Sequence, residues 1–222
     1  MLLRGNFDRH LHALESEVLV MGNMVDQALA HSMDALKNRD LKLAQQVIDK
    51  DALIDEKRRG IESLGVQLMV TQQPVASDLR IILSALYIAV DMERIADHAE
   101  GTARIALMIG DEPPLKPLID LPRMTDTVRD MLKRTLDALV KRDAQCARAI
   151  TDEDDHIDNI YDQVFRELLT FMIEDPRTIT RATRLMWAAH NLERSADHVT
   201  NICERVVFIA TGNFEEMRTS KY

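Results

Sequence analysis

The sequence is poor in the residues that build turns and sheets. Its 222 residues include only 7 glycines, 6 prolines and 4% aromatic residues. Folds with many strands need many tight turns, and glycine and proline supply most of them. Apolar residues nevertheless make up 46% of the chain, so leucine, alanine, isoleucine, valine and methionine must form the core. This composition predicts an all-α fold.

Positive charge is also scarce. Lysine and arginine number 28 against 37 aspartate and glutamate residues, which gives a formal net charge of −9. Proteins that bind nucleic acid need a basic surface to neutralise phosphates, so this balance excludes a general nucleic-acid binder. The charged fraction of 29%, combined with the large apolar content, also excludes a disordered chain.

Long apolar runs and paired cysteines are absent as well. The longest uncharged apolar stretch, residues 81–90, is about half as long as a membrane span requires. The first residues do not combine a basic start with a long apolar stretch, so no signal peptide is expected. Cys146 and Cys203 are too few for a disulfide framework and are expected to be small buried apolar residues. We therefore expect a soluble cytoplasmic protein without a transmembrane segment.

Proline is concentrated in one place. Four of the six prolines lie within residues 113–122, shortly after Gly110. Because proline removes a helix hydrogen bond and clashes with the preceding turn, no continuous helix crosses this stretch. It is predicted to link two repeats of near-equal length, the first over residues 1–110 and the second over residues 115–222.

Each half has the pattern of three long helices. Apolar residues from Phe7 to Ala28 alternate in steps of four and three, which is typical of a helix that packs against others at a shallow angle. After this helix, the others are expected over residues 41–71 and 75–110, then over residues 118–141, 144–174 and 178–212. Short connections make neighbouring helices antiparallel, so the predicted fold is two tandem three-helix bundles.

The two halves carry the same motif. Residues 93–98 read Glu-Arg-Ile-Ala-Asp-His and residues 193–198 read Glu-Arg-Ser-Ala-Asp-His, so five of six residues match one hundred positions apart. The helix breaks and the acidic middle segments align as well, at residues 73–74 and 175–176 and at residues 51–55 and 154–158. A repeat of this length predicts an internal duplication of a whole bundle, not a solenoid of short units.

Each copy of the motif places two carboxylates four residues apart, Glu93 with Asp97 and Glu193 with Asp197. Residues at this spacing share one helix face, where like charges repel each other. A divalent or trivalent cation would offset that repulsion, since such ions prefer carboxylate oxygens. One turn later the second copy adds two oxygen-bearing residues and the first copy does not: Asn201 and Glu204 against Gly101 and Arg104.

A solvated charged face would show the same spacing, with Arg94 and Arg194 in weak surface ion pairs. The duplication argues against that alternative, because such a face has no reason to repeat five residues in six. Residues 81–90 are apolar nearly all round, which predicts a buried segment before the acidic residues reach a bundle face. Trp187 lies in an apolar helical run and is expected in the core.

Nothing in the sequence resembles a complete catalytic set, so the chain is not expected to be an enzyme. A metal-dependent carboxylate enzyme of the di-iron type stays open, although such sites need a Glu-x-x-His spacing twice and it occurs once, at Glu153 and His156. A purely structural helical scaffold also stays open. His98 and His198 are candidates for metal ligation, for a pH-sensitive contact or for local hydrogen bonding.

Two tandem bundles that each carry Glu-Arg-x-x-Asp-His on the last helix resemble the PhoU family of phosphate-signalling regulators. The segments at residues 7–11, 73–80 and 201–205 are also similar to that family. The resemblance covers nearly the whole chain.

The resemblance implies a negative regulator of the phosphate-starvation response that modulates phosphate uptake. Its expected partners are the ATPase subunit of the high-affinity phosphate ABC transporter and the sensor histidine kinase of the phosphate response. It would act in the cytoplasm, recruited to the inner face of the membrane by these partners, and a homodimer is expected.

Some PhoU proteins bind multinuclear iron or zinc clusters and others lack metal, so the resemblance admits iron, zinc, manganese or magnesium as a cofactor. The metal-binding residues that it implies are Glu93, Asp97, Glu193, Asp197, Asn201 and Glu204, with Asp55 and Asp158 from the middle helices. The residues beside the carboxylates are expected to contact partners: Arg94, Arg194, His98 and His198. Gly101 and Arg104 depart from the Asn and Glu often found in the family.

Overall fold

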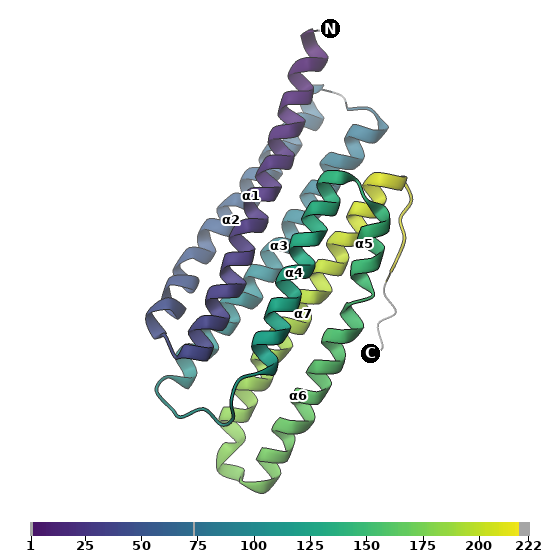
Figure 1. Cartoon of the computed structure of the whole chain (residues 1–222). Coiled ribbons are helices and arrows are strands. Elements are labelled where there is room, and N and C mark those ends of the chain that lie inside the picture. Colours follow the sequence, from purple (N-terminus) through teal and green to yellow (C-terminus); the bar gives the residue numbers. More distant parts are fainter. Residues whose placement is uncertain (1, 73, 218–222) are drawn as a thin grey trace.

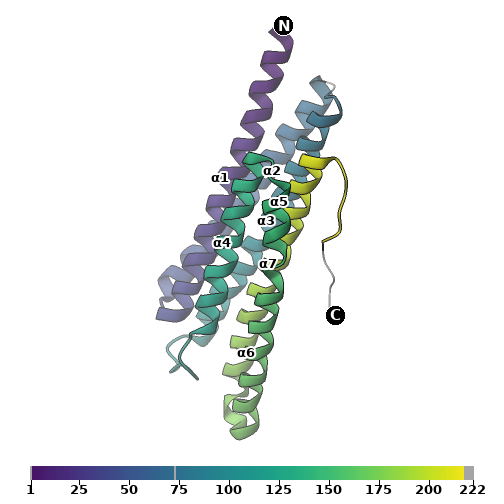
Figure 2. The ribbon, with the colours of Figure 1, turned by 45° about the vertical axis from the view of Figure 1, so that its right-hand side comes forward.

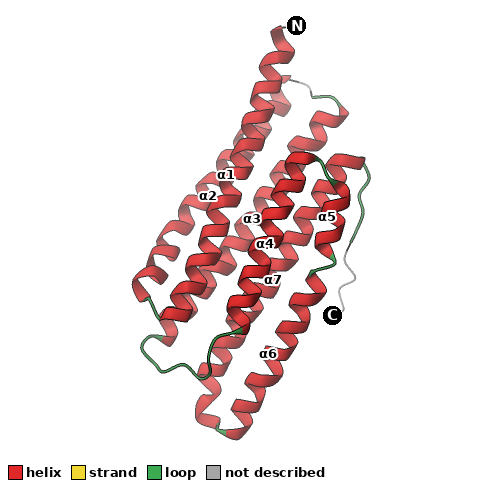
Figure 3. Ribbon diagram, in the orientation of Figure 1, coloured by secondary structure: helices red, strands yellow, loops and turns green. Residues whose placement is uncertain are grey.

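The computed structural model of this chain describes residues 2–72 and 74–217 (Figure 1). The described residues form helices and no strand, which confirms the predicted fold class (Figure 3). The helices are α1 (Leu2–Asn38), α2 (Leu41–Gln72), α3 (Ala76–Ile109), α4 (Asp120–Lys141), α5 (Ala144–Thr151), α6 (Asp154–Glu174) and α7 (Ile179–Thr211), with a 3-10 turn at Pro176–Thr178 before α7. The predicted break between α2 and α3 includes Gln73, which lies outside the described residues.

Helices α1, α2 and α3 pack together as one trio, and α4, α5 with α6, and α7 form the second. The trios lie side by side, with α3 against α7 and α1 against α4 (Figures 1 and 2). They are also shifted lengthwise, so the start of α1 extends beyond one end and the α6–α7 hairpin beyond the other. The central pair α3–α7 therefore joins the two halves of the duplicated sequence.

Glycine ends the last helix of each trio. Gly110 follows α3 with a φ of 61° and Gly212 follows α7 with a φ of 82°, both in the left-handed region that favours glycine. The backbone N–H of each glycine donates to a carbonyl four residues earlier, from Gly110 to Ala106 and from Gly212 to Phe208. These two ends confirm the predicted stops of both long helices.

The middle helix of the second trio differs from the prediction. The sequence predicts one helix over residues 144–174, and this prediction is wrong, because α5 and α6 are separate helices with Asp152 and Glu153 between them. Four consecutive acidic residues, 152–155, repel one another at this point. Glu153 also faces α4, where Arg134 donates to its carboxylate at 2.8 Å. The break therefore lies at the clustered charges, one of which is paired with Arg134.

The core follows the predicted seam of α1, and the seam residues that are buried include Phe7, Leu11, Leu14, Val18, Met21 and Val25. Cys203 is buried as expected, while Cys146 is only half-buried, and both thiols are free. The expected burial of Cys146 is therefore wrong, and so are two further predictions of burial. Within residues 81–90, Tyr87 is 52% exposed, and Trp187 on α7 is 53% exposed. Each of these helices contacts its own trio and the other long helix, which leaves one side of it uncovered.

Candidate functional site: the α3–α7 pair and its acidic motifs

The two copies of the motif meet in the middle of the antiparallel α3–α7 pair. The rings of His98 on α3 and His198 on α7 stack with their centroids 5.7 Å apart. Helical spacing places these residues on the faces that the two helices turn toward each other, so the repeated histidine is part of the contact between the trios. The duplication thus produces a contact in which each helix supplies the same residue.

A polar network surrounds the stacked histidines. The carboxylate of Asp91 accepts a hydrogen bond from Nδ2 of Asn201 at 3.1 Å and lies 2.9 Å from Nδ1 of His198. At the position equivalent to Asp91 in the second copy, Asn191 donates to Oγ1 of Thr102 at 3.4 Å. One histidine therefore faces a carboxylate, while the equivalent of that carboxylate is a neutral amide.

The surroundings of His98 determine its charge. Burial lowers the pKa of His98 to about 4, with further lowering by the nearby His198, Arg194 and His190 and a small opposing contribution from a hydrogen bond with Asn191. His98 is consequently neutral at neutral pH. The six-residue motif does not include this network. Extending the comparison of the two halves to Asp91 and Asn191, two residues before the motif, would have pointed to it.

Gly101 lies where α3 and α7 approach closely. A Cβ atom at this position would be 2.9 Å from Nδ2 of Asn191. The departure from the family's Asn at this position therefore has a packing explanation, because Asn191 occupies the space that a side chain at 101 would need.

The first motif lies against α2 in a group of carboxylates. Glu93 is within 3.7 Å of both Arg58 on α2 and Arg94, and Asp97 accepts a hydrogen bond from Arg94 at 3.4 Å. The side chain of Asp97 is 42% exposed. Burial raises the pKa of Glu93, with repulsion from Asp97 adding to it, and burial also raises the pKa of Asp97.

Asp51 on α2 completes this group. Its pKa is raised to about 6, first by burial and then by repulsion from four neighbouring carboxylates. These neighbours, in decreasing order of effect, are Glu100, Asp97, Asp55 and Glu93. We call Asp51, Asp55, Glu93, Asp97 and Glu100 the first acidic cluster. Asp51 lies in the acidic segment that aligned with residues 154–158, but the sequence did not mark it as a site residue.

The second motif has different surroundings. The side chain of Asp197 is only 6% exposed and is paired with Arg194, and Glu193 lies 3.3 Å from His190. The sequence predicted that both acidic motifs face outward. Asp97 is exposed as predicted, whereas for Asp197 the prediction is wrong. Its carboxylate is buried between neighbouring helices and neutralised by an arginine, as burial of a charge requires.

The other implied ligands of the second motif have separate contacts. Asn201 bonds to Asp91 across the helix pair, and Glu204 accepts a hydrogen bond at 2.9 Å from the backbone N–H of Met217. Asp158 lies on α6, half-buried. In the first trio Arg104, the counterpart of Glu204, donates to Glu100 at 2.6 Å on the surface.

Metal coordination requires several ligands around one point. In residues 2–72 and 74–217, no three side chains from His, Cys, Asp and Glu converge so that they could hold a metal ion. The first acidic cluster offers the hard oxygen ligands that Mg²⁺ or Mn²⁺ prefers, but the side chains would have to move to enclose an ion. Both residues of the isolated Glu-x-x-His spacing contact arginines. Arg134 donates to Glu153, and His156 lies 3.4 Å from Arg123.

Exposed aromatic residues occupy the uncovered side of both helices. Tyr87 on α3 and Trp187 on α7 are equivalent positions of the duplication, and each lies seven residues before the motif arginine, Arg94 or Arg194. Residues seven apart share a helix face. The guanidinium of Arg205 lies over the ring of Tyr87, 4.0 Å from its centroid.

No helix within the described part of the chain is long and apolar enough to cross a membrane.

Comparison with known proteins gives one consistent result. A family model described as the PhoU domain matches residues 18–106 and again residues 121–206. A phosphate-specific transport system accessory protein PhoU homolog of Rhizobium meliloti (strain 1021) is 41% identical over 93% of this chain and 87% of its own length. The corresponding homolog of Pseudomonas putida is 37% identical over 93% of this chain and 81% of its length.

Comparison with solved structures identifies the same family. The PhoU crystal structure from Pseudomonas aeruginosa matches with a TM-score of 0.89 and 35% identity, covering 93% of this chain and 100% of that one. The phosphate transport system regulatory protein PhoU from Streptococcus pneumoniae matches with a TM-score of 0.88 and 30% identity, over 95% of this chain and 99% of the other. With the motif repeated on α3 and α7 and the family domain matched in both halves, this chain belongs to the PhoU family.

Proposed function

We propose that this chain is a regulatory accessory protein of a phosphate-specific transport system, and that it represses the phosphate-starvation response while phosphate is plentiful. The observation that supports this most strongly is the match, nearly end to end and 41% identical, to a relative named as an accessory protein of that system. The protein acts by binding and not by catalysis. Its partners are the ATPase subunit of the phosphate ABC transporter and the cytoplasmic part of a sensor histidine kinase.

Such coupling requires a binding surface. The uncovered side of the α3–α7 pair supports one, because Tyr87, Trp187, Arg94 and Arg194 are all partly exposed and occupy equivalent positions on the two helices. Tryptophan, tyrosine and arginine are the residue types that most often dominate binding energy at protein interfaces. We call these four residues the aromatic–arginine face.

Regulation also requires that the protein distinguish two states of its partner. A ligand that binds both states equally shifts no equilibrium. In the proposed function, the aromatic–arginine face binds the kinase more tightly in its inactive state. The elongated pair of trios then holds the kinase and the transporter together.

A reporter experiment tests this proposal. The chain is expressed in a bacterium that lacks its own PhoU protein, and an alkaline phosphatase reporter of the phosphate regulon is measured in phosphate-rich medium. The wild-type chain is expected to restore repression, whereas the double variants Tyr87→Ala with Arg94→Ala and Trp187→Ala with Arg194→Lys, which keeps the positive charge beside Asp197, restore it incompletely.

The matched control replaces Phe165 and Arg177 with alanine, since both are exposed and lie on α6 and on the turn before α7. It should repress as the wild type does. Full repression by both double variants would reject the aromatic–arginine face as the binding surface. Failure of the wild-type chain to repress, with normal expression, would reject the regulatory function in that host.

A cation site at the first acidic cluster is a second proposal. The observation that favours it is the concentration of five carboxylates whose mutual repulsion contributes to the raised pKa of Asp51. Iron, zinc, manganese and magnesium are the ions to examine. Elemental analysis after equilibrium dialysis is expected to find bound metal in the wild type and much less in the variant Glu93→Gln with Asp97→Asn.

The control for this experiment is the variant Glu193→Gln with Asp197→Asn, which changes the same residue types in the second motif. It is expected to keep the metal, because Asp197 is already neutralised by Arg194. Equal loss of metal from both variants would mean that the two motifs form one site, and no metal in the wild type would reject the proposal.

A further inference from the structure

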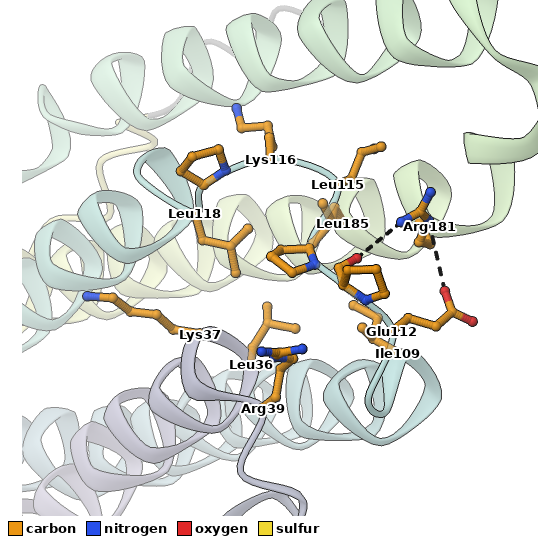
Figure 4. A pocket seen from close by; sticks show the side chains of 13 residues that line it. Leu36, Lys37, Arg39, Ile109, Glu112, Leu115, Lys116, Leu118, Arg181 and Leu185 are labelled. Atoms are coloured by element: carbon orange, nitrogen blue, oxygen red, sulfur yellow. Dashed lines mark hydrogen bonds and ion pairs between the residues drawn. The ribbon is translucent and has the colours of Figure 1, made fainter.

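A cavity lies where the proline-rich linker joins the two trios (Figure 4). Its volume is about 340 Å³, within the range of small-molecule sites. Leu36 at the end of α1, Ile109 at the end of α3 and Leu185 on α7 contribute to its walls, and linker residues 113–118 complete it. The cavity is therefore bounded by both halves of the duplication.

The walls of the cavity are mostly apolar. Besides the three residues above, they include Pro114, Leu115 and Leu118. Leu115 and Leu118 pack against the hydrophobic core. Proline fixes the backbone angle φ, so this part of the linker has few alternative conformations. An apolar body entering the cavity would displace water from surfaces that already have their bound shape, which favours binding.

Contacts from both trios hold the linker in place. On one side, Nη1 of Arg39 donates to the carbonyl of Asp111 at 3.5 Å. On the other side, Nη1 of Arg181 donates to the carbonyl of Pro113 at 3.1 Å, and Nε of the same residue lies 4.0 Å from the carboxylate of Glu112 (Figure 4). These contacts from opposite sides fix the linker between the trios, so the cavity is formed before any ligand binds.

The rim of the cavity is basic although the protein is acidic. Four cations line it, Lys37, Arg39, Lys116 and Arg181, against one carboxylate, Glu112. The whole chain has a formal charge of −9. Such a local concentration of positive charge attracts anions against the background of the protein.

Two of these cations are available to a ligand. Lys116 pairs with Asp120 and Glu167, and Arg181 pairs with Glu112. Across residues 2–72 and 74–217, by contrast, no carboxylate forms an ion pair with Lys37 or Arg39. The planar guanidinium of Arg39 has several N–H groups besides the one that faces Asp111, and it suits a carboxylate or a phosphate.

We propose that this cavity binds a small amphipathic anion, with its apolar body between the linker and the three helices and its carboxylate or phosphate at Lys37 and Arg39. The apolar walls distinguish such a ligand from inorganic phosphate, which could use only the rim. Because the ligand would touch both trios and the linker, binding would also stabilise their mutual arrangement. The site lies apart from the aromatic–arginine face and does not depend on the proposed regulatory function.

Two fluorescent probes with nearly the same apolar body test this proposal with the full chain. 8-Anilinonaphthalene-1-sulfonate carries an anionic group, and N-phenyl-1-naphthylamine is its neutral analogue. The anionic probe is expected to bind saturably with one molecule per chain and more tightly than the neutral probe. In an NMR spectrum of the labelled protein, it should shift the amide signals of residues 36–39 and of the linker.

Variants separate the two parts of the site. Arg39→Gln and Lys37→Gln should each weaken binding of the anionic probe about tenfold, as loss of a charged hydrogen bond does, and Lys37→Gln, which leaves the linker contacts intact, should not affect the neutral probe. Leu118→Trp should fill the cavity and weaken both probes. Leu115→Trp provides a second filling variant if the first does not fold. Lys141→Gln, an exposed lysine at the end of α4, is the matched control and should bind as the wild type does.

Several results would overturn the proposal. One is equal binding of the anionic probe by the wild type and by Arg39→Gln with Lys37→Gln. Another is NMR shifts confined to the surface around Tyr87. Displacement of the anionic probe by inorganic phosphate, with phosphate binding intact in Leu118→Trp, would indicate a simple anion site and reject the amphipathic ligand. Unchanged binding of both probes by both filling variants would exclude the cavity itself.

Discussion

Asp97 and Asp197 occupy the same position of the duplicated motif, yet their environments differ. Asp97 is 42% exposed and belongs to a cluster of five carboxylates, whereas Asp197 is 6% exposed and is paired with Arg194. The same arginine precedes both residues, but Arg94 lies farther from its partner and also faces Glu93. Duplication therefore preserved the motif, while the packing around it left Asp97 at the surface and buried Asp197.

The residues one helical turn after each motif predicted the opposite difference between the two copies. From the sequence, the oxygen-bearing side chains of Asn201 and Glu204 predict a metal site at the second copy. Gly101 and Arg104 offer no such ligands at the first copy. In the structure, Asn201 and Glu204 have other partners. The carboxylates instead concentrate around the first copy, where burial and four neighbouring carboxylates raise the pKa of Asp51 to about 6.

The largest expected effect comes from removing the buried carboxylate. Asp197→Ala should lower the free energy of unfolding by about 2–3 kcal/mol, because it removes the buried carboxylate that pairs with Arg194. Asp97→Ala should change it by less than about 0.5 kcal/mol, as exposed ion pairs do. Denaturant titrations of both variants at pH 7, in the presence of EDTA, measure the difference. Equal costs for the two substitutions would contradict the structural contrast.

Much of this architecture could be predicted from the sequence. The steps of four and three from Phe7, the prolines of residues 113–122 and the repeated motif together predict two tandem trios. The pairing of α3 with α7 could not be predicted in the same way, because helical periodicity identifies an apolar face but not the helix that covers it. For that reason Trp187, which lies in an apolar run, was expected in the core and is exposed.

The contacts between distant residues were equally hidden. The close approach of Gly101 to Asn191 is determined by two residues ninety positions apart. The break after α5 depends on Arg134, which reaches Glu153 from another helix. Local spacing contains neither contact, so the environment of each motif copy could be determined only once the helices were placed.

The interface histidine gives the next largest effect. The pKa of His98 is about 4 in the fold against 6.5 in the unfolded chain, so the unfolded state binds more protons between these values. Stability should therefore fall as the pH decreases from about 6.5 to about 4, by about 2 kcal/mol in total. His98→Gln should remove this part of the pH dependence. Unfolding curves at pH 7, 5.5 and 4.5 in EDTA measure it.

The equivalent variant His198→Gln is the control for that experiment. His198 stacks on His98 and lies 2.9 Å from the carboxylate of Asp91. The largest cause of the low pKa of His98 is its own burial, which His198→Gln leaves in place. We therefore expect His198→Gln to leave the loss of stability at low pH in place. A wild type whose unfolding free energy does not change between pH 6.5 and 4.5, combined with an unchanged curve for His98→Gln, would show that His98 is not buried as described.

Asp51 should act in the opposite direction. Its pKa is raised from 3.8 to about 6 in the fold, so the folded state binds more protons between these values, and ionisation of Asp51 lowers stability as the pH rises from about 3.8 to about 6. Asp51→Asn should raise the free energy of unfolding by about 1 kcal/mol at pH 8 and leave it nearly unchanged at pH 3.5. The same urea titrations in EDTA measure both values. A destabilised variant at pH 8 would mean that the carboxylates do not repel one another.

The smallest effects should separate Arg104 from Glu204, the two residues that follow the motifs at equivalent positions. Arg104 and Glu100 form an exposed pair one helical turn apart, so Arg104→Ala should cost about 0.3 kcal/mol or less. Glu204 accepts the N–H of Met217 in a partly buried contact, so Glu204→Ala should cost about 1 kcal/mol. Thermal unfolding at pH 7 measures both costs. A larger cost for Arg104→Ala would show that the first copy has structural contacts comparable to those of the second, and the distinction between an exposed cluster and a neutralised interior motif would no longer hold.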